Sequence, residues 1–151
     1  MGTIAEMPEY RVILNPTDGS AASELATVHA VYLAKISGAR LLLVYVVDEA
    51  SARRAGVNIR RAMEDMRKKG EVVLSSVKAF AEANGVAAES ILAKGQTAPT
   101  ILNVCKDRGA NLIVMGATAY SDLARLMARA VSISEEILKE SRCPVLIVRG
   151  A

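Results

Sequence analysis

The sequence is poor in several residue types that mark particular classes of protein. Its 151 residues include no tryptophan, only 3% are aromatic, and there is a single histidine. The core must therefore be built from Ala, Val, Leu, Ile and Met, and few rings are present on which nucleic-acid bases could stack. His29 falls in the middle of an expected helix, so no Ser-His-Asp set or other enzyme constellation can be assembled around it.

Cysteines and long apolar runs are equally scarce. Cys105 and Cys143 form no CxxC pair and have no metal-ligand spacing, so no metal site is expected. Both lie in apolar segments, which favours free, buried and unreactive thiols over a disulfide or a nucleophile. The longest apolar run, LLLVYVV (41–47), is far too short to span a membrane. The N-terminal residues MGTIAEMPEY lack the features of a signal peptide, so a cytoplasmic protein is expected.

The net charge is only +3, which is weak support for a nucleic-acid partner. Basic residues do recur at intervals of seven within one expected helix, and acidic Glu64 and Asp65 are interleaved with them. The basic positions are Arg53, Arg54, Arg60, Arg61, Arg67 and Lys68. We interpret this stripe as a solvent-exposed helix face, with nucleic-acid binding as the minor alternative.

Apolar runs alternate with helical patterns along the whole chain. This order predicts one α/β domain over residues 1–151, with residues 1–9 as an N-terminal extension and a doubly wound parallel sheet covered by helices on both faces. Ligands of such sheets bind beyond the carboxyl ends of the strands, where NPTDGS, YVVDEA and MGATAY would lie. The expected strands are 11–15, 39–47, 87–93, 111–116 and 143–148, and the expected helices are 20–37, 52–84, 97–108 (capped by Thr97) and 132–141.

The chain contains four segments in the order ILNPTDGS, LLLVYVVD, LIVMG and CPVLIV. Together they resemble the universal stress protein family, and Gly95 stands where that family has a glycine after its third strand. The resemblance covers nearly the whole chain, from Arg11 to Arg149. It implies a Rossmann-like, adenine nucleotide alpha hydrolase-like fold of five strands in the order 3-2-1-4-5. It also implies a homodimer formed through the last strand.

The ATP-binding branch of this family carries the motif G-x2-G-x9-G-[ST], which is degenerate in this sequence. Gly116 matches the first glycine, Ala119 replaces the second, Val131 replaces the third and Ser132 matches the serine, in a loop two residues longer. Phosphate binding needs converging backbone N–H groups with no side chain in the way. A left-handed backbone is strongly disfavoured for a β-branched residue. The S-x-x-E pattern of Ser132 and Glu135 predicts a capping box, which would explain Ser132 without a phosphate. We therefore expect weak or absent ATP binding.

The nucleoside half of the family site is better retained. The resemblance places Asp18 beside the adenine and Val46 in the hydrophobic wall, with Pro16 and Thr17 completing the turn and Met115 preceding the glycine of the fourth strand. Asp18 has an equally good explanation as a turn residue that caps the first helix together with Ser20. The sequence assigns no role to Asn15.

Two functions of different class follow from the resemblance. The first is a dimeric stress-response or regulatory module that binds ATP weakly or not at all and acts through unknown protein partners. The second is a nucleotide-dependent switch that binds ATP or AMP, with Mg²⁺, and hydrolyses ATP slowly at most. Neither an enzyme of another kind, nor a membrane protein, nor a nucleic-acid-binding protein is expected.

Overall fold

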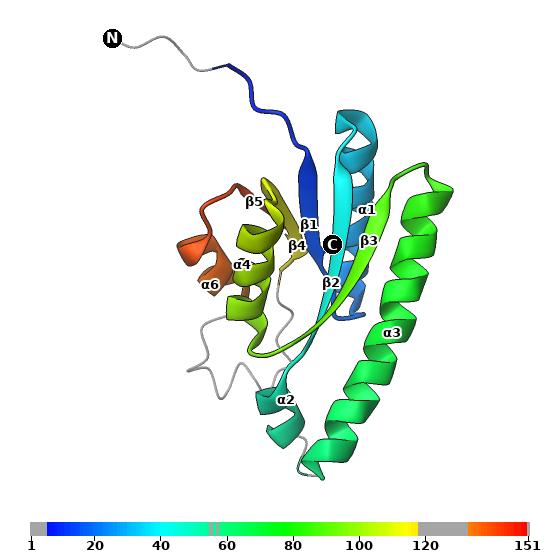
Figure 1. Ribbon diagram of the computed structural model, residues 1–151, viewed down its shortest axis with the longest axis vertical. Helices are drawn as coiled ribbons and strands as arrows, with labels where there is room; N and C mark the ends of the chain where they lie inside the picture. The colour runs from blue at the N-terminus through cyan, green and yellow to red at the C-terminus, as the bar shows by residue number, and fades with distance from the viewer. Residues whose placement is uncertain (1–5, 55, 57, 118–132, 151) are drawn as a thin grey trace.

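The computed structural model describes residues 6–54, 56, 58–117 and 133–150, in which five parallel strands form one sheet (Figure 1). The strand order is β3-β2-β1-β4-β5, which confirms the order implied by the sequence resemblance. All four neighbouring pairs are parallel. The strands are β1 (Val12–Pro16), β2 (Arg40–Val47), β3 (Ala88–Lys94), β4 (Leu112–Gly116) and β5 (Val145–Val148).

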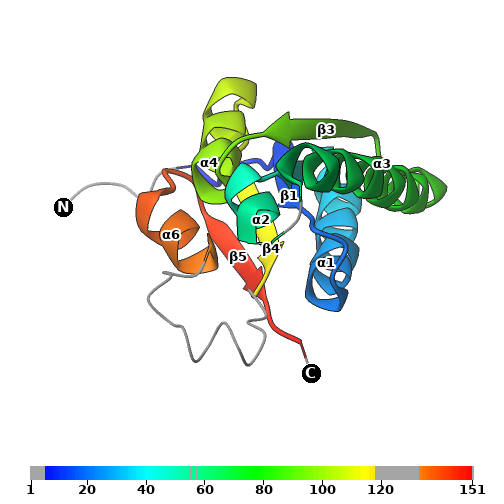
Figure 2. The ribbon, with the colours of Figure 1, turned by 90° about the horizontal axis from the view of Figure 1, so that it is seen from below.

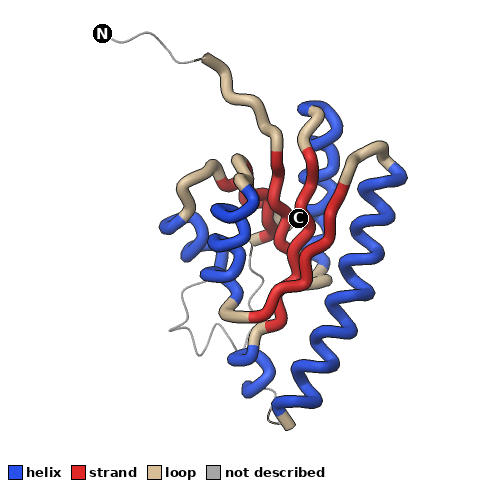
Figure 3. Tube along the Cα trace, in the orientation of Figure 1, coloured by secondary structure: helices blue, strands red, loops and turns tan. Residues whose placement is uncertain are grey.

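Helices cover both faces of the sheet, as Figures 1 and 2 show. On one face lie α1 (Ala21–Ser37) and α3 (Ile59–Ala83), and on the other lie α4 (Thr97–Arg108) and α6 (Ile133–Glu140). The short α2 (Glu49–Arg54) stands beyond the ends of the strands. Figure 3 shows the strands gathered in one layer with helices around them, and along the chain strand and helix alternate except that α2 and α3 both lie between β2 and β3.

The interior strand β2, which lies between β3 and β1, supplies side chains to two separate cores, because successive residues of a strand point to opposite faces. Leu41, Leu43 and Tyr45 pack with the helices on the α1 and α3 side. Leu42 and Val44 pack with those on the α4 and α6 side. The apolar character of both faces of this segment, which predicts a central parallel strand, is confirmed.

The first helix begins and ends where its sequence predicts. The hydroxyl of Ser20 accepts a hydrogen bond from the N–H of Ser23 at 3.2 Å, so Ser20 is the N-cap of α1. Gly38 adopts a left-handed φ of 76° and ends the helix. The chain therefore enters α1 directly from the turn that follows β1, and that turn is fixed at the carboxyl end of the sheet.

The expected single helix over 52–84 is wrong, because the structure has two helices there. Gly56 adopts a left-handed φ of 69° after α2, and the Asn58 side chain accepts a hydrogen bond from the Arg61 N–H at 3.3 Å to start α3. The basic stripe is therefore split between α2 and α3 rather than continuous. Within α3, Arg67 pairs with Glu64 and Glu71, each at 2.6 Å. Such pairs fit a solvent-exposed face.

Asn15, which the sequence left without a role, is fully buried in β1. Its side-chain N–H donates to the carbonyl of Val114 in β4 at 2.8 Å, and its oxygen accepts from the Thr27 hydroxyl of α1 at 2.8 Å. A buried amide is tolerated when its hydrogen bonds are satisfied. Asn15 therefore joins two strands and a helix through polar contacts inside an apolar core.

The cysteine expectation is confirmed in one respect and wrong in another. Both thiols are free, as expected, and Cys105 is buried. Cys143 is only half-buried, because it lies in the chain entering the last, outer strand rather than inside the sheet. Among the described residues, no helix is both long enough and apolar enough to cross a membrane.

Candidate functional site

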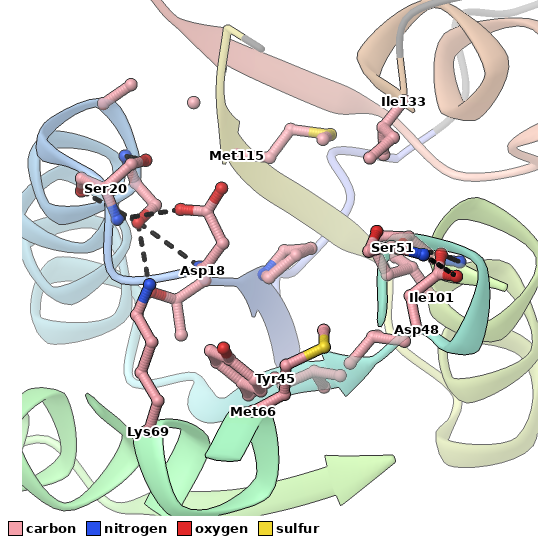
Figure 4. Close-up of a pocket in the computed structure, with 18 of the residues that line it drawn as sticks. Asp18, Ser20, Tyr45, Asp48, Ser51, Met66, Lys69, Ile101, Met115 and Ile133 are labelled. Atoms are coloured by element: carbon pink, nitrogen blue, oxygen red, sulfur yellow. Dashed lines mark hydrogen bonds between the residues drawn. The ribbon is translucent and has the colours of Figure 1, made fainter. Parts of the chain in front are cut away.

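A cavity of about 320 Å³ opens at the carboxyl ends of β1, β2 and β4 (Figure 4). This is the position where the strand order of such a sheet reverses, because the chain crosses from β1 to β2 on one side and β4 joins β1 on the other. Its volume lies within the range of small-molecule sites. The structure brings together six of the nine site residues predicted from the sequence: Pro16, Thr17, Asp18, Val46, Met115 and Gly116.

The turn after β1 forms one wall of the cavity and is held rigidly. The backbone N–H of Thr17 donates to the carbonyl of Val44 at 2.8 Å, and its buried hydroxyl lies 3.2 Å from that of Ser23. Gly19 follows with a φ of 83°, a backbone conformation that favours glycine. A side-chain carbon at Gly19 would also meet Val73 at 2.9 Å, so the turn lies closely against α3.

Asp18 presents a carboxylate at the mouth of this turn. Its Oδ1 accepts a hydrogen bond from the N–H of Ser20 at 2.9 Å. Partial burial raises the pKa of Asp18, but hydrogen bonds from Ser20 and Ser23 act against it. The positive charge of Lys69 adds to them, and the pKa of Asp18 lies below its ordinary value. Asp18 is therefore ionised at neutral pH, and its predicted role as a turn residue is confirmed.

The sequence did not identify the second wall, which comes from β2 and α3. Tyr45, Met66 and Lys69 line it, and Figure 4 shows Lys69 alongside the Asp18 turn. Burial, with the negative charge of Asp18 as a second cause, raises the pKa of Tyr45, so the phenol is neutral. No local motif marks Met66 and Lys69, because only the packing of α3 brings them to the cavity.

A glycine permits that packing. A side-chain carbon at Gly70 would lie 2.6 Å from the ring of Tyr45 and 2.8 Å from Leu92. Real contacts of that kind are not tolerated, so Gly70 lets α3 approach both β2 and β3 closely.

Asp48, just beyond β2, forms the third wall together with the start of α4. One oxygen accepts from the backbone N–H of Thr97 at 3.0 Å and from its hydroxyl at 2.8 Å, while the other accepts from the N–H of Ala50 at 2.9 Å. The expected capping of α4 by Thr97 is therefore wrong. Thr97 is the first helical residue, and the carboxylate of Asp48, which follows β2, caps the helix.

These hydrogen bonds set the ionisation of Asp48. Partial burial raises its pKa, but the bonds from Thr97, Ala50 and Ser51 outweigh burial and lower the pKa below its ordinary value. Asp48 therefore adds negative charge to the cavity. Its oxygens accept hydrogen bonds that hold the starts of α2 and α4.

The β4 side contributes Met115, Gly116 and, from α6, Ile133. A side-chain carbon at Gly116 would lie 2.7 Å from the carbonyl oxygen of Ala22, so this glycine is required by the close approach of β4 to α1. The next residue, Ala117, donates its N–H to the carbonyl of Val148 at 2.9 Å. Ala119, Val131 and Ser132, the other predicted site residues, lie outside the described residues.

A sequence profile of the Universal stress protein family matches residues 9–149. The chain belongs to this family. It is 35% identical to the universal stress protein YxiE of Bacillus subtilis, an alignment that covers 93% of this chain and 99% of that protein. It is 34% identical to a universal stress protein of Methanocaldococcus jannaschii, covering 93% of this chain and 82% of the relative.

Solved structures support the fold of this family member. A universal stress protein of Methanocaldococcus jannaschii superposes with a TM-score of 0.80 at 24% identity, covering 95% of this chain and 99% of that one. A universal stress protein in complex with cAMP superposes at 0.72 and 20% identity, covering 95% and 100%. One from Archaeoglobus fulgidus in complex with dAMP superposes at 0.67 and 15%, covering 93% and 98%.

The described lining of this cavity contains the carboxylates of Asp18 and Asp48. Among the described residues, no group of three or more His, Cys, Asp or Glu side chains could hold a metal ion. Asp18 and Asp48 project from different strand ends, and their hydrogen-bond partners are backbone N–H groups and hydroxyls.

Proposed function

We propose that this universal stress protein is a dimeric stress-response or regulatory module that binds ATP weakly or not at all. Its cavity would take the nucleoside part of an adenine nucleotide better than the triphosphate. The module acts through binding to protein partners, which the chain itself does not identify, and not through a catalytic step.

The charge of the cavity carries this proposal. Among the described residues that line it, Lys69 is the one cation, whereas Asp18 and Asp48 both bear negative charge. A triphosphate entering this space meets repulsion that an uncharged nucleoside does not. The sequence adds that Ala119 and Val131 replace two glycines of the family's phosphate motif. Two lost charge-assisted hydrogen bonds, each about 1.5–3 kcal/mol, would weaken ATP at least roughly a hundredfold.

A second candidate, a switch that binds ATP or AMP with Mg²⁺, is favoured by the cavity itself. A space of about 320 Å³ at the strand ends, lined by Val46, Tyr45 and Ile101, offers an apolar surface to a base. The distant relatives in complex with cAMP and dAMP support a nucleoside monophosphate as its ligand. On this alternative, slow hydrolysis of ATP is measurable as phosphate release over hours.

Calorimetry with adenosine, AMP and Mg-ATP separates the two. We expect a dissociation constant for Mg-ATP above about 10 μM, equivalent to about −7 kcal/mol. Compared with a family member whose motif is intact, this protein should lose less affinity for adenosine and AMP than for Mg-ATP. Tighter binding of Mg-ATP, or steady phosphate release, would favour the switch and overturn our proposal.

Two variants make the test sharper. Asp18→Asn should weaken adenosine about tenfold by removing a charged hydrogen-bond acceptor, whereas Asp107→Asn, an exposed change at the far end of α4, should leave it unchanged. Restoring glycine at positions 119 and 131 and deleting two loop residues should strengthen Mg-ATP binding. If the restored loop binds no better than the natural one, loss of glycine does not explain weak binding.

A further inference from the structure

The two cysteines are far apart in the sequence but adjacent in the fold. The sulfur of Cys105, in α4, lies 3.4 Å from the sulfur of Cys143, which precedes β5. Cys105 lies in the core between the sheet and the α4 and α6 layer, and the partly buried Cys143 packs against that core. A disulfide bond is about 2.05 Å long, so the two sulfurs need to approach by about 1.4 Å. Such a change lies within the reach of side-chain rotation.

The two thiols have different surroundings. Cys105 is buried, and its thiol contacts the carbonyl oxygen of Ala110 at 3.6 Å. Cys143 is half-buried and is held by the Ser141 hydroxyl, which accepts from its backbone N–H at 3.2 Å and donates to its carbonyl oxygen at 2.9 Å. The same hydroxyl lies 3.5 Å from the Cys143 sulfur. Cys143 is therefore the more solvent-accessible cysteine of the two, and Cys105 is the more buried.

We propose that Cys105 and Cys143 are an oxidation-sensitive pair that forms a reversible intramolecular disulfide when a hydroperoxide oxidises the protein. This replaces the expectation of inert thiols. In a reducing compartment the pair rests as two thiols, and disulfides of such proteins are characteristically transient and redox-sensing.

The reaction balances in two steps. The sulfur of Cys143 attacks a peroxide oxygen, which breaks the O–O bond and yields a sulfenic acid and water when the oxidant is hydrogen peroxide. The sulfur of Cys105 then attacks the Cys143 sulfur, a sulfur–sulfur bond forms, and hydroxide leaves and takes up the Cys105 proton as a second water. Two thiols and one hydrogen peroxide thus give one disulfide and two waters.

The order of these steps follows from the surroundings of each thiol. Burial, together with the contact between the Cys105 and Cys143 thiols, raises the pKa of Cys105 to about 12, so Cys105 stays protonated and reacts poorly with peroxide itself. Its role is to resolve the sulfenic acid that forms 3.4 Å away. The new bond would tie α4 to the chain entering β5 and close the segment from 105 to 143.

The test uses the full chain, reduced and then exposed to one to five equivalents of hydrogen peroxide. We expect the intact mass to fall by about 2 Da, one peptide pair to carry the 105–143 crosslink, and both free thiols to disappear. Dithiothreitol should restore the thiols. The oxidised form should also melt about 5 °C or more higher, because the crosslink restricts the unfolded chain.

Matched variants distinguish the pair from a chance contact. Cys105→Ala should accumulate sulfenic acid at Cys143, trapped by dimedone at least tenfold above the natural protein. Cys143→Ala should show neither sulfenic acid nor disulfide. Circular dichroism of each reduced variant checks that it folds. Crosslinks between two chains, overoxidation of Cys143 while Cys105 stays free in the natural protein, or no reaction at all would each overturn the proposal.

Discussion

The two edges of the sheet differ in what they present to another strand. Within the part of the chain that the structure describes, β3 at one edge pairs with β2 alone. It carries charged residues, including Glu89, which pairs with Arg108 and lies 3.7 Å from Arg40. At the other edge β5 pairs, within the same residues, with β4 alone and consists of four aliphatic residues, Val145–Val148. Both edges expose backbone hydrogen-bonding groups, but β3 carries charged side chains among its apolar ones and β5 carries none.

That difference explains why we assign self-association to β5. Proteins protect exposed strand edges with charges, and an uncharged aliphatic edge invites another strand. The helix α3 also runs alongside β3, as Figure 1 shows. The homodimer that we propose therefore forms through β5, while the β3 edge does not pair with another chain. Leu92 of β3 and Leu146 of β5 are exposed to nearly the same extent, 37% and 38%, which provides a matched pair for testing the contrast.

The largest effect is expected from a charge at the β5 edge. Leu146→Lys should weaken the dimer at least a hundredfold, because a desolvated charge would face its own copy across a symmetric interface. Leu92→Lys should leave the dimer intact. Light scattering at micromolar concentration measures both. A monomeric natural protein, or equal effects of the two substitutions, would show that the edges do not differ as proposed.

A methyl group added beneath β3 should have the next largest effect. Gly70→Ala should lower the free energy of unfolding by about 1–3 kcal/mol, because its new carbon would overlap Tyr45 and Leu92 and force α3 away from the β3 edge. Urea denaturation measures the loss. Gly38→Ser is a useful contrast, since nothing lies within 4 Å of its added carbon and only its left-handed φ opposes the change. Equal stability of Gly70→Ala and the natural protein would contradict close packing there.

Asp48 holds the start of α4, where the chain leaves β3. Removing the Asp48 carboxylate should have a smaller effect on stability, and that effect should depend on pH. Asp48→Asn should reduce stability by about 1 kcal/mol at pH 7, the usual worth of a helix cap. The folded-state pKa of Asp48 is lowered, so its contribution is complete above the unfolded value near 3.9 and is lost as pH falls through the folded-state pKa. The gap between variant and natural protein should therefore close below about pH 4. A gap that persists at pH 2 would rule out the carboxylate as its source.

The smallest effect is expected from the charge on β3 itself. Glu89→Gln breaks two exposed ion pairs and should change stability by less than about 1 kcal/mol. The contribution of the Glu89 charge would instead be seen as slow association of the Glu89→Gln variant in concentrated samples, since the β3 edge loses part of its charge. If Glu89→Gln destabilises the fold strongly, the ion pairs hold the edge together instead of keeping it solvated.

The sequence predicts the strands well because each is bounded by turn residues and most are apolar runs. Ser20 and Gly38 likewise locate the ends of α1 through local hydrogen-bonding chemistry. The sequence pattern does not predict the break between α2 and α3, because the helical pattern of charges continues across it. Gly56 and Asn58 are the local signals that mark the break.

The site was predicted in part for the same reason. Asp18 and Met115 follow or end strands, and the rule for parallel sheets places them together. Lys69 and Met66 lie in the middle of a long helix, where their positions depend on how closely Gly70 lets α3 approach the sheet. The contact between Cys105 and Cys143 also arises only when α4 and the chain entering β5 pack together, so no local sequence pattern predicts it.

The strand order has a consequence for how the protein is made. Pairing of β1 with β2 joins residues such as Ile13 and Leu41, whereas pairing of β1 with β4 joins Ile13 to Leu112. Synthesis from the N-terminus therefore completes the β1, β2 and β3 half of the sheet first, and leaves one side of β1 without a partner until β4 emerges from the ribosome. The long-range seam beside Asn15 then closes late, because contacts distant in sequence form slowly. During that interval the central strand β1 is a temporary sheet edge, open to pairing with another chain.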